Sequence, residues 1–298
     1  MANAFDGDVL VGLSGIDLQG ESYDLGEGIS IRTTYAHLIG AFLVAFSPAE
    51  SGQHHPPPWK SARTGIGIDI VAELHIPQAT MGLSTNERLD LVQLIVALLR
   101  LWVTPTVTAP MLSNIPFASA KDVPDNEAYL WPYEFRGFEH PFQRDGGVED
   151  GALDWVRDNW KRAFELTRSS TEFRAAVFAL DQTQFMKDRT LVLISFWAAM
   201  EGLFLTNAQE LRFRLASFVA SYMENPGPPR IAMYKMILNL YDHRSKAAHG
   251  KPKNDPEALG KSFNLLRSVV LRIVDDNQIP SNEQLEARLL SDQNPQDS

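Results

Sequence analysis

The chain has 298 residues, of which 44% are hydrophobic and 21% are charged, and its 27 Lys and Arg against 37 Asp and Glu give a formal net charge of −10. This composition is that of an ordinary globular protein and excludes wholesale disorder. The absence of cysteine excludes disulfides, thiolate metal sites, iron–sulfur clusters and a cysteine nucleophile, and it agrees with a reducing compartment.

The sequence also indicates where the protein resides. The N-terminal stretch MANAFDGDVLVG has neither the basic nor the apolar segment of a secretory signal. The most apolar run, residues 191–205, is interrupted by Glu201 and is shorter than the roughly 20 residues that a bilayer span needs. We therefore expect a soluble, cytoplasmic protein with no membrane partner.

The first third of the chain is predicted to be rich in β-strands. Three glycine-punctuated stretches have the alternating β-branched residues that are typical of strands: residues 9–18, 28–35 and 65–76. The apolar stretch 36–46 fits either a buried helix or a strand, and the proline run in 51–59 predicts a loop. His54 and His55 in this loop have no carboxylate at ligand spacing, so we expect no metal site there.

A capped helix follows this β-rich part. Ser84 and Glu87 form a capping-box pair ahead of a broad apolar face, which comprises Leu89, Leu91, Val92, Ile95, Leu98 and Leu99. Residues 104–150 are rich in proline, glycine and aromatic residues and have little periodicity. We interpret them as an irregular connection that contains a domain boundary.

From residue 151 onward the pattern predicts one helix after another. Apolar spacing and capping residues place them at 153–166, 173–180, 187–205, 207–222 with Asn207 as cap, 230–248, from Asp255 onward, and after the Ser281–Gln284 pair. The predicted fold class is therefore α+β, with an N-terminal β-rich domain over residues 1–150 and an all-α helical bundle over residues 151–298.

Charge is unevenly distributed along the chain. Residues 1–60 contain seven acidic residues against two basic ones, whereas residues 230–254 contain six basic residues against Asp242 alone. The basic segment is therefore the better candidate for an anionic ligand. Common phosphate-loop, serine-hydrolase and zinc-protease motifs are absent, and GIGID at 65–69 lacks the third glycine of a dinucleotide fingerprint.

The remaining candidate for chemistry is LNLYDHRSKAAHGKPK, residues 238–253. Basic residues are favoured at a helix C-terminus by the macrodipole, so Arg244, Lys246 and His249 could be capping and surface charges alone. Arg244 and His249 have the spacing R-x4-H, however, and YDHRSKAAHGK resembles the motif of Apea-like HEPN domains. The segments SFWAAMEGLFL and ELRFRLASFVASYM are similar to the two helices that precede this motif, so the resemblance covers about residues 185–275.

The resemblance implies an HEPN-like helical bundle that acts as a metal-independent endoribonuclease without cofactor. In many HEPN domains two R-x4-H motifs meet across the helical interface of a homodimer. Arg244 and His249 would then be catalytic: histidine moves a proton near neutral pH while the 2′-hydroxyl attacks, and the arginine fork stabilises the phosphoryl oxygens. The RNA would be held by three lysines: Lys246, Lys251 and Lys253.

Four further residues are candidates for supporting roles: Glu201, Tyr241, Asp242 and Ser245. Glu201 would orient Arg244 or a 2′-hydroxyl, or it is a half-buried ion-pair partner. Ser245 stands where many HEPN proteins have Asn, Asp or His, and it can donate a hydrogen bond to phosphate. His243 is interpreted as a surface or partner contact. Aromatic residues at helical spacing are interpreted as core or dimer interface: Phe196, Trp197, Phe204, Phe213 and Phe218.

Helix geometry limits how Arg244 and His249 can meet. Positions five apart differ by about 140° around an ideal helix axis, so the two residues do not share a face. They converge only if the helix ends between them or if a partner copy supplies one of them. We therefore expect an isolated monomer to be inactive.

Two other hypotheses remain open at this point. A non-catalytic HEPN-fold module would bind RNA, a nucleotide or a protein without cutting, because a fold alone does not define a function. Alternatively, the acidic N-terminal part is a sensor that shields the basic segment until a trigger arrives. HEPN domains recur in bacterial toxin–antitoxin and anti-phage systems, which would add an antitoxin or another regulatory partner.

Overall fold

The computed structural model describes residues 5–124, 127–134, 137–140, 142, 151–204, 210–249 and 255–290, without the side chains of 41, 42, 62–64 and 66. The chain forms two compact units. Unit 1 comprises Met1–Val92 and Thr106–Phe135, and unit 2 comprises Gln93–Pro105 and Arg136–Ser298. The division along the chain therefore differs from the expected one at residue 150, because residues 93–105 and 136–150 belong to unit 2.

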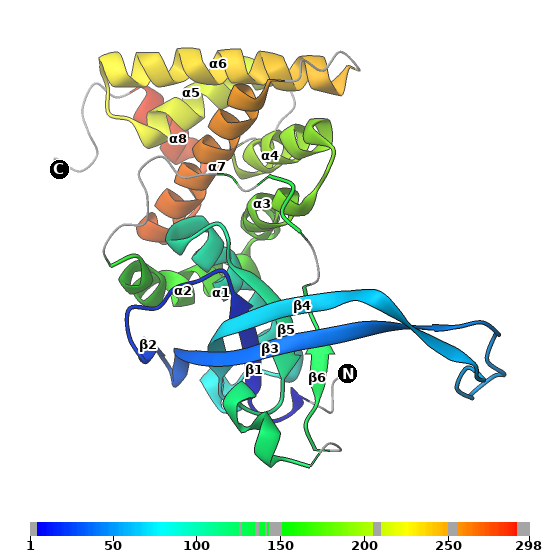
Figure 1. The fold of residues 1–298 in the computed structure, drawn as a ribbon. Helices are drawn as coiled ribbons and strands as arrows, with labels where there is room; N and C mark the ends of the chain where they lie inside the picture. Colours follow the sequence, from blue (N-terminus) through cyan, green and yellow to red (C-terminus); the bar gives the residue numbers. More distant parts are fainter. Residues whose placement is uncertain are drawn as a thin grey trace. The chain divides into compact units, whose positions relative to one another are not determined.

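Within the described residues, unit 1 is built on a six-stranded antiparallel sheet with the strand order β2-β3-β4-β1-β5-β6 (Figure 1). The strands are β1 (Val9–Ser14), β2 (Ser22–Gly26), β3 (Ile29–Ala45), β4 (Trp59–Ile76), β5 (Thr108–Ser113) and β6 (Leu130–Pro132). The three predicted strands are confirmed. The ambiguous stretch 36–46 continues β3 as a strand up to Ala45, and most of the predicted loop 51–59 connects β3 to β4.

The interpretation of residues 104–150 as irregular throughout was wrong, because β5 and β6 lie in it. Strand β5 pairs with β1 on one side and with β6 on the other. All but the first of its six residues are buried. A strand that is buried on both faces shows no alternation of apolar and polar residues, so the sequence contains no period-2 signal there.

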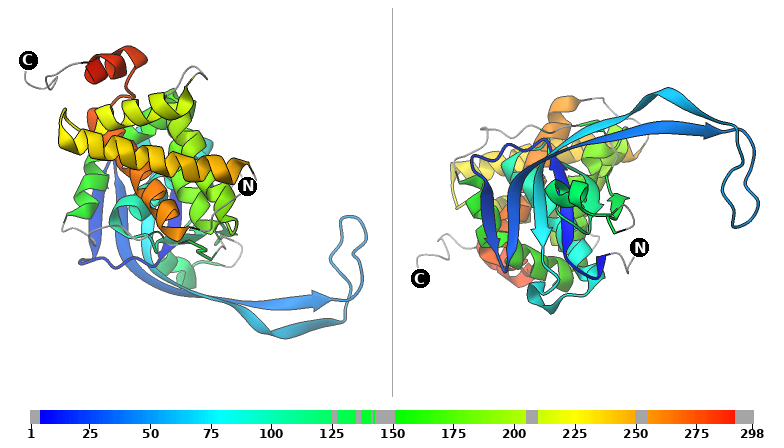
Figure 2. Two further views of the ribbon diagram at one scale, coloured as in Figure 1. Left: turned by 90° about the horizontal axis from the view of Figure 1, so that it is seen from above. Right: turned by 60° about the horizontal axis from the view of Figure 1, so that its bottom comes forward.

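Strands β3 and β4 extend beyond the rest of the sheet as a two-stranded ribbon (Figure 2). Strand β2 pairs with β3 only at Ile29–Arg32, and β1 pairs with β4 only at Ala72–Ile76. The strand residues outside these pairings, 34–45 of β3 and 59–71 of β4, are called the arm below.

Helix α1 (Thr85–Leu98) begins as the sequence predicts. The Ser84 N–H donates to the Glu87 carboxylate at 3.0 Å, and the Glu87 N–H donates to Ser84 Oγ at 3.4 Å, which is a capping box. A π-helical turn, Leu99–Val103, follows directly. It contains Arg100, which forms a fully buried ion pair with Asp181 at 2.6 Å, and this pair fastens the turn to the helices of unit 2.

Unit 2 is helical over the ranges that are described. Its helices are α2 (Ala152–Ser169), α3 (Thr171–Gln182), α4 (Arg189–Phe204), α5 (Leu211–Met223), α6 (Pro228–Ala248), α7 (Pro256–Asp276) and α8 (Asn282–Leu290). A helix is present in each predicted stretch, and Asp255 and the Ser281–Gln284 pair are confirmed as caps, but α5 begins only at Leu211, after Glu210 in a left-handed conformation. The predicted cap Asn207 lies outside the described residues. The fold class is therefore α+β.

The helices of unit 2 enclose a core that positions the end of α6. Helix α6 packs on α4, α5 and α7. Four of the five aromatic residues singled out in the sequence are buried, namely Phe196, Trp197, Phe204 and Phe218, whereas Phe213 is exposed and meets Tyr234 edge-on. No helix in the described ranges has both the length and the apolar composition needed to cross a membrane.

Candidate functional site

Most of the candidate residues lie in the last two turns of α6, and Glu201 lies on α4. The helix continues without a break to Ala248, and His249 is its C-terminal cap, with a backbone N–H that donates to the Ser245 carbonyl at 3.2 Å. Arg244 is therefore inside the helix, and His249 is the first residue beyond it.

Arg244 points into unit 2, toward α4. Its Nη2 lies 3.0 Å and 3.1 Å from the two carboxylate oxygens of Glu201, and its guanidinium lies 5.4 Å from the centre of the Tyr241 ring. The Arg244 and Glu201 side chains are only 23% and 19% exposed. The predicted pairing of Glu201 with Arg244 is thus present, and it is a largely desolvated ion pair.

Tyr241 completes this cluster. Its hydroxyl donates to Glu201 Oε1 at 3.0 Å, so one carboxylate accepts hydrogen bonds from both residues of α6. Burial, reinforced by the negative charge of Glu201, raises the pKa of Tyr241 to about 12. Tyr241 therefore stays neutral and acts as a donor. We call Glu201, Tyr241 and Arg244 the carboxylate cluster.

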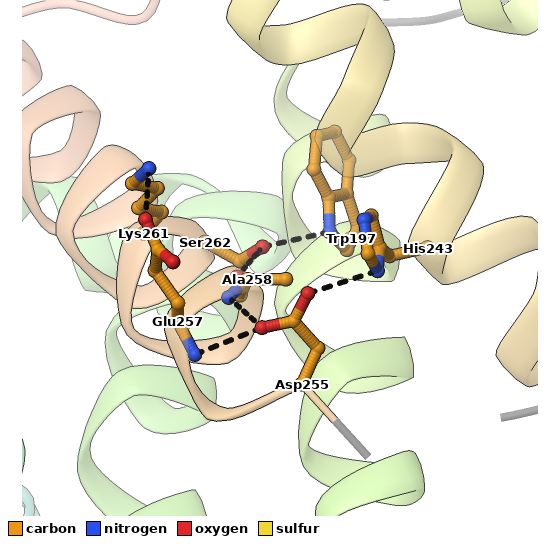
Figure 3. A network of polar contacts seen from close by, with 7 residues as sticks. All are labelled: Trp197, His243, Asp255, Glu257, Ala258, Lys261 and Ser262. Carbon is orange, nitrogen blue, oxygen red and sulfur yellow. Dashed lines mark hydrogen bonds and ion pairs between the residues drawn. The ribbon is translucent and has the colours of Figure 1, made fainter. Parts of the chain in front are cut away.

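Trp197 links the carboxylate cluster to α7. Its ring meets the ring of Tyr241 edge-on at 5.3 Å. Its indole Nε1 donates to Ser262 Oγ at 3.2 Å, and the Ser262 hydroxyl donates to the Ala258 carbonyl at 2.8 Å (Figure 3). The aromatic residue and its partners thus hold α4, α6 and the first turns of α7 together.

His243 makes a second link between α6 and α7. Its Nδ1 lies 3.6 Å from a carboxylate oxygen of Asp255 (Figure 3). The other carboxylate oxygen of Asp255 accepts from the Glu257 and Ala258 N–H groups, each at 3.1 Å, as an N-cap does. His243 thus contacts the start of α7 within the same chain. The sequence had predicted a surface or partner contact for this residue.

Asp242 and Ser245 lie on other sides of α6. Asp242 forms a bidentate ion pair with Arg212 of α5, at 2.8 Å and 3.0 Å. Ser245 is half-buried, and its carbonyl accepts from the His249 N–H. Within the described residues, neither side chain forms a hydrogen bond or ion pair with the carboxylate cluster. Of the four candidate supporting residues, the structure brings only Glu201 and Tyr241 to Arg244.

His249 and Lys246 are exposed, and in the described part of the chain neither side chain has a hydrogen bond or ion pair. Arg244 lies near the middle of the buried face of α6, which includes Ile237, Leu240 and Tyr241. His249 is about 140° from it around the helix axis. One copy of the chain therefore directs the arginine inward and the histidine outward. Lys251, Lys253 and Gly250 lie outside the described residues.

This arrangement provides a fixed cation and an exposed imidazole. The Nη1 of Arg244 has no acceptor among the described residues, because Glu201 engages Nη2 only, and its buried Nε is also without an acceptor there. A guanidinium held in this way can still donate to a phosphate oxygen. An exposed imidazole can exchange protons with a ligand.

Three contacts were not predicted from the sequence. Trp197 links α4 to α6 and α7, Arg212 pairs with Asp242, and Asp255 contacts His243 in addition to capping α7. The only local signal among these was the Asp-Pro-Glu start of α7.

In the described ranges, no group of three or more His, Asp and Glu side chains is arranged to hold a metal ion. Comparison of the chain with protein-family models, curated proteins and solved structures finds no match.

Proposed function

We propose that unit 2 is an endoribonuclease of the HEPN type that cleaves RNA without a metal ion as a homodimer. The observation that supports this proposal best is the pair of groups at the end of α6. Arg244 is fixed by Glu201 and Tyr241, and His249 is exposed and uncommitted within the described residues. Together they supply the positive charge and the proton carrier that the reaction requires.

The reaction needs no group beyond these and the RNA. The 2′-oxygen forms a bond to the adjacent phosphorus while the bond from phosphorus to the 5′-oxygen breaks. His249 accepts the proton of the 2′-hydroxyl, and a proton passes to the departing 5′-oxygen from the imidazolium so formed or from solvent, so the protons balance. Arg244 stabilises the charge that develops on the non-bridging oxygens. The products are a cyclic phosphate and a 5′-hydroxyl, so no water is consumed in this step.

Two copies are needed because of the helix geometry. The carboxylate cluster fixes Arg244 toward α4, whereas His249 points away from that side by about 140°. Since α6 is continuous up to Ala248, no bend brings the two side chains together within one chain. A composite site, with Arg244 from one copy and His249 from the other, satisfies the geometry. Lys246, and beyond the described residues Lys251 and Lys253, would then contact flanking phosphates.

A non-catalytic HEPN-fold module for RNA, a nucleotide or a protein is the second candidate. One observation favours it: Arg244 is largely buried and already paired, so its charge also serves to hold α6 on α4. In that case the resemblance to Apea-like HEPN domains would extend to the fold and not to the reaction. Both candidates suit RNA as the partner, and a bacterial toxin or anti-phage system as the setting.

The test is cleavage of a mixed RNA pool in the presence of EDTA. Arg244→Lys keeps a charge for Glu201 but loses the planar fork, and His249→Ala removes an exposed ring. We expect each variant to lose activity by about 100-fold or more. Arg212→Ala is the matched control, because Arg212 also pairs with an aspartate of α6 but has no proposed role in cleavage.

Each outcome separates the candidates. Loss of cleavage in the two site variants, with Arg212→Ala active, supports the ribonuclease. Equal cleavage by all four proteins contradicts it. A wild type that retains RNA on a filter without cutting supports the binding module instead.

A further inference from the structure

The arm of unit 1 is a two-stranded ribbon whose outer edges have no partner strands in the described residues. From Ala36 to Ala45, β3 pairs with β4 alone (Figure 2). An isolated two-stranded ribbon is marginally stable in water, and unpaired strand edges are places where another chain can add. The arm therefore needs either cover from its own unit or a partner.

Its own unit covers only one face, near the base. Ala36, Leu38 and Ile70 pack against Met111 and Phe117. The alternate positions of β3 point to the opposite face, since side chains alternate along a strand. We call that side the outer face.

Large apolar side chains form a ridge along the outer face. Tyr35, Ile39 and Leu43 lie on this face of β3 and are 68%, 82% and 65% exposed, and the His37–Asp69 pair, at 2.7 Å, lies between the first two. Trp59, which is 54% exposed, joins the same face because it lies opposite Ala45 in the register. Single exposed apolar residues are ordinary, but several on one face of a ribbon mark an interaction surface.

The neighbouring strand presents a furrow beside this ridge. Gly67 lies opposite Ile39 in the register, and Gly65 lies two residues further along β4 on the same face. A Cβ added at Gly67 would meet only the His37 ring within 4 Å, at 3.4 Å from Nε2. The two glycines of GIGID thus form a shallow strip of bare backbone. A ridge on β3 and a furrow on β4 are complementary to the same face of a second copy related by a two-fold axis.

Charge favours a second copy over an anionic partner. Residues 34–71 contain Glu50, Lys60, Arg63 and Asp69 as their only formal charges, so this segment is neutral within a chain of charge −10. A neutral surface lets two acidic chains approach without bringing like charges together. It offers nothing to attract RNA or an anionic membrane surface.

The exposed area is sufficient for a weak, specific dimer. At ~200 Å² for a complete aromatic side chain and about 100 Å² for an aliphatic one, the four side chains of the ridge expose roughly 400 Å². If about 60% of an interface is apolar, this corresponds to roughly 650 Å² per copy, at the low end of the standard range.

We propose that the arm is a self-association surface, in which the outer faces of two copies of this chain pack against each other around a two-fold axis. The residues that define it are Tyr35, Ile39, Leu43 and Trp59 on the ridge and Gly67 in the furrow. The inference stands on unit 1 alone and does not rest on the ribonuclease proposed for unit 2.

The test is sedimentation velocity of the full chain over about 1 to 100 µM, a range that suits an interface of this size. The wild type should associate through the arm, to a dimer or, where the unit 2 dimer proposed above also forms, to a tetramer. Ile39→Lys combined with Leu43→Lys should weaken this step of association by at least about 100-fold, because two charges per copy would be buried without partners. Leu290→Lys is the matched control, since Leu290 is also 82% exposed but lies at the end of α8. It should associate as the wild type does.

A second variant separates association from folding. Gly67→Val fills the furrow with a residue that favours strands, so we expect an unchanged or higher melting temperature together with weaker dimerisation. A wild type that stays monomeric throughout overturns the proposal, as does a dimer that the arm variants leave intact. The latter result would still allow a dimer through unit 2. A monomer that floats with neutral phosphatidylcholine vesicles would also overturn it and assign the arm to a bilayer.

Discussion

Replacing Glu201 by alanine leaves two largely buried donors, the Arg244 guanidinium and the Tyr241 hydroxyl, without their acceptor. Breaking a fully buried ion pair costs about 3–5 kcal/mol. The two charged side chains here are 19% and 23% exposed, so solvent recovers part of that loss, and we expect a cost of about 2 kcal/mol. The Asp242 and Arg212 side chains are 43% and 50% exposed. Replacing Asp242 should therefore lower the free energy of unfolding by only about 0.5 kcal/mol.

The measurement is a pair of double-mutant cycles in which the free energy of unfolding of each variant is determined by urea denaturation. The far-UV circular dichroism signal of the helices reports on unit 2. The cycle of Glu201→Ala and Arg244→Ala should give a coupling energy of about 1.5 kcal/mol, against at most about 0.5 kcal/mol for Arg212→Ala and Asp242→Ala. Coupling in the first cycle no larger than in the second would refute the reasoning. Arg244 would then not be fixed by Glu201, and the positioning of the proposed site would fail.

Three further predictions concern titration and capping. Because the pKa of Tyr241 is raised to about 12 from 10.0, its contribution to stability is complete below pH 10 and is lost as the pH rises to 12. Tyr241→Phe should therefore lose less stability than the wild type between pH 9 and 11 in urea titrations, by up to about 1.4 kcal/mol per pH unit above pH 10. Burial raises the pKa of Glu73 in the folded protein above 4.5. The contribution of Glu73 to stability is therefore complete below pH 4.5 and is lost as the pH rises through its pKa in the folded state. Glu73→Gln, which keeps an acceptor for the Phe117 N–H, should melt at a higher temperature than the wild type at neutral pH and lose that advantage in acid. Asp255→Ala should cost about 1 kcal/mol through loss of the α7 cap, whereas Asp255→Asn should cost less than half as much in the same unfolding assay.

Features that depend on neighbouring residues were predictable from the sequence. The caps at Ser84, Asp255 and Ser281 are set by side chains that reach a backbone N–H two or three residues away, so their pattern is visible locally. The same holds for the helices of unit 2, whose apolar spacing recurs every three to four residues.

Features that depend on distant pairing were not predictable. The stretch 36–46 is a strand because it pairs with residues 59–70 of β4, and its own periodicity suits a helix equally well. Strand β5 was missed because burial on both faces removes the alternation. The exposure of the outer face of the arm follows from the ends of β1 and β2, which no local pattern indicates.

The residues of the carboxylate cluster were predictable and their arrangement was not, whereas the candidates Asp242 and Ser245 lie on other sides of α6. Glu201 and Arg244 are 43 positions apart, and the sequence left open whether Glu201 contacts Arg244, a 2′-hydroxyl or another ion-pair partner. The opposite directions of Arg244 and His249 do follow from helix geometry, because α6 is regular up to Ala248. What the sequence could not supply was the packing of α4 and α7 that fixes Arg244 through Tyr241 and Trp197.

The central claim is that one copy supplies Arg244 and the other supplies His249, and mixing two inactive variants tests it most directly. Arg244→Ala and His249→Ala are combined in equal amounts, allowed to exchange subunits, and assayed on RNA with EDTA present. Random exchange makes half of the dimers mixed, and each mixed dimer has one intact composite site of two, so we predict recovery of about one quarter of the wild-type rate. No recovery, with both variants dimeric and exchanging, would contradict the claim.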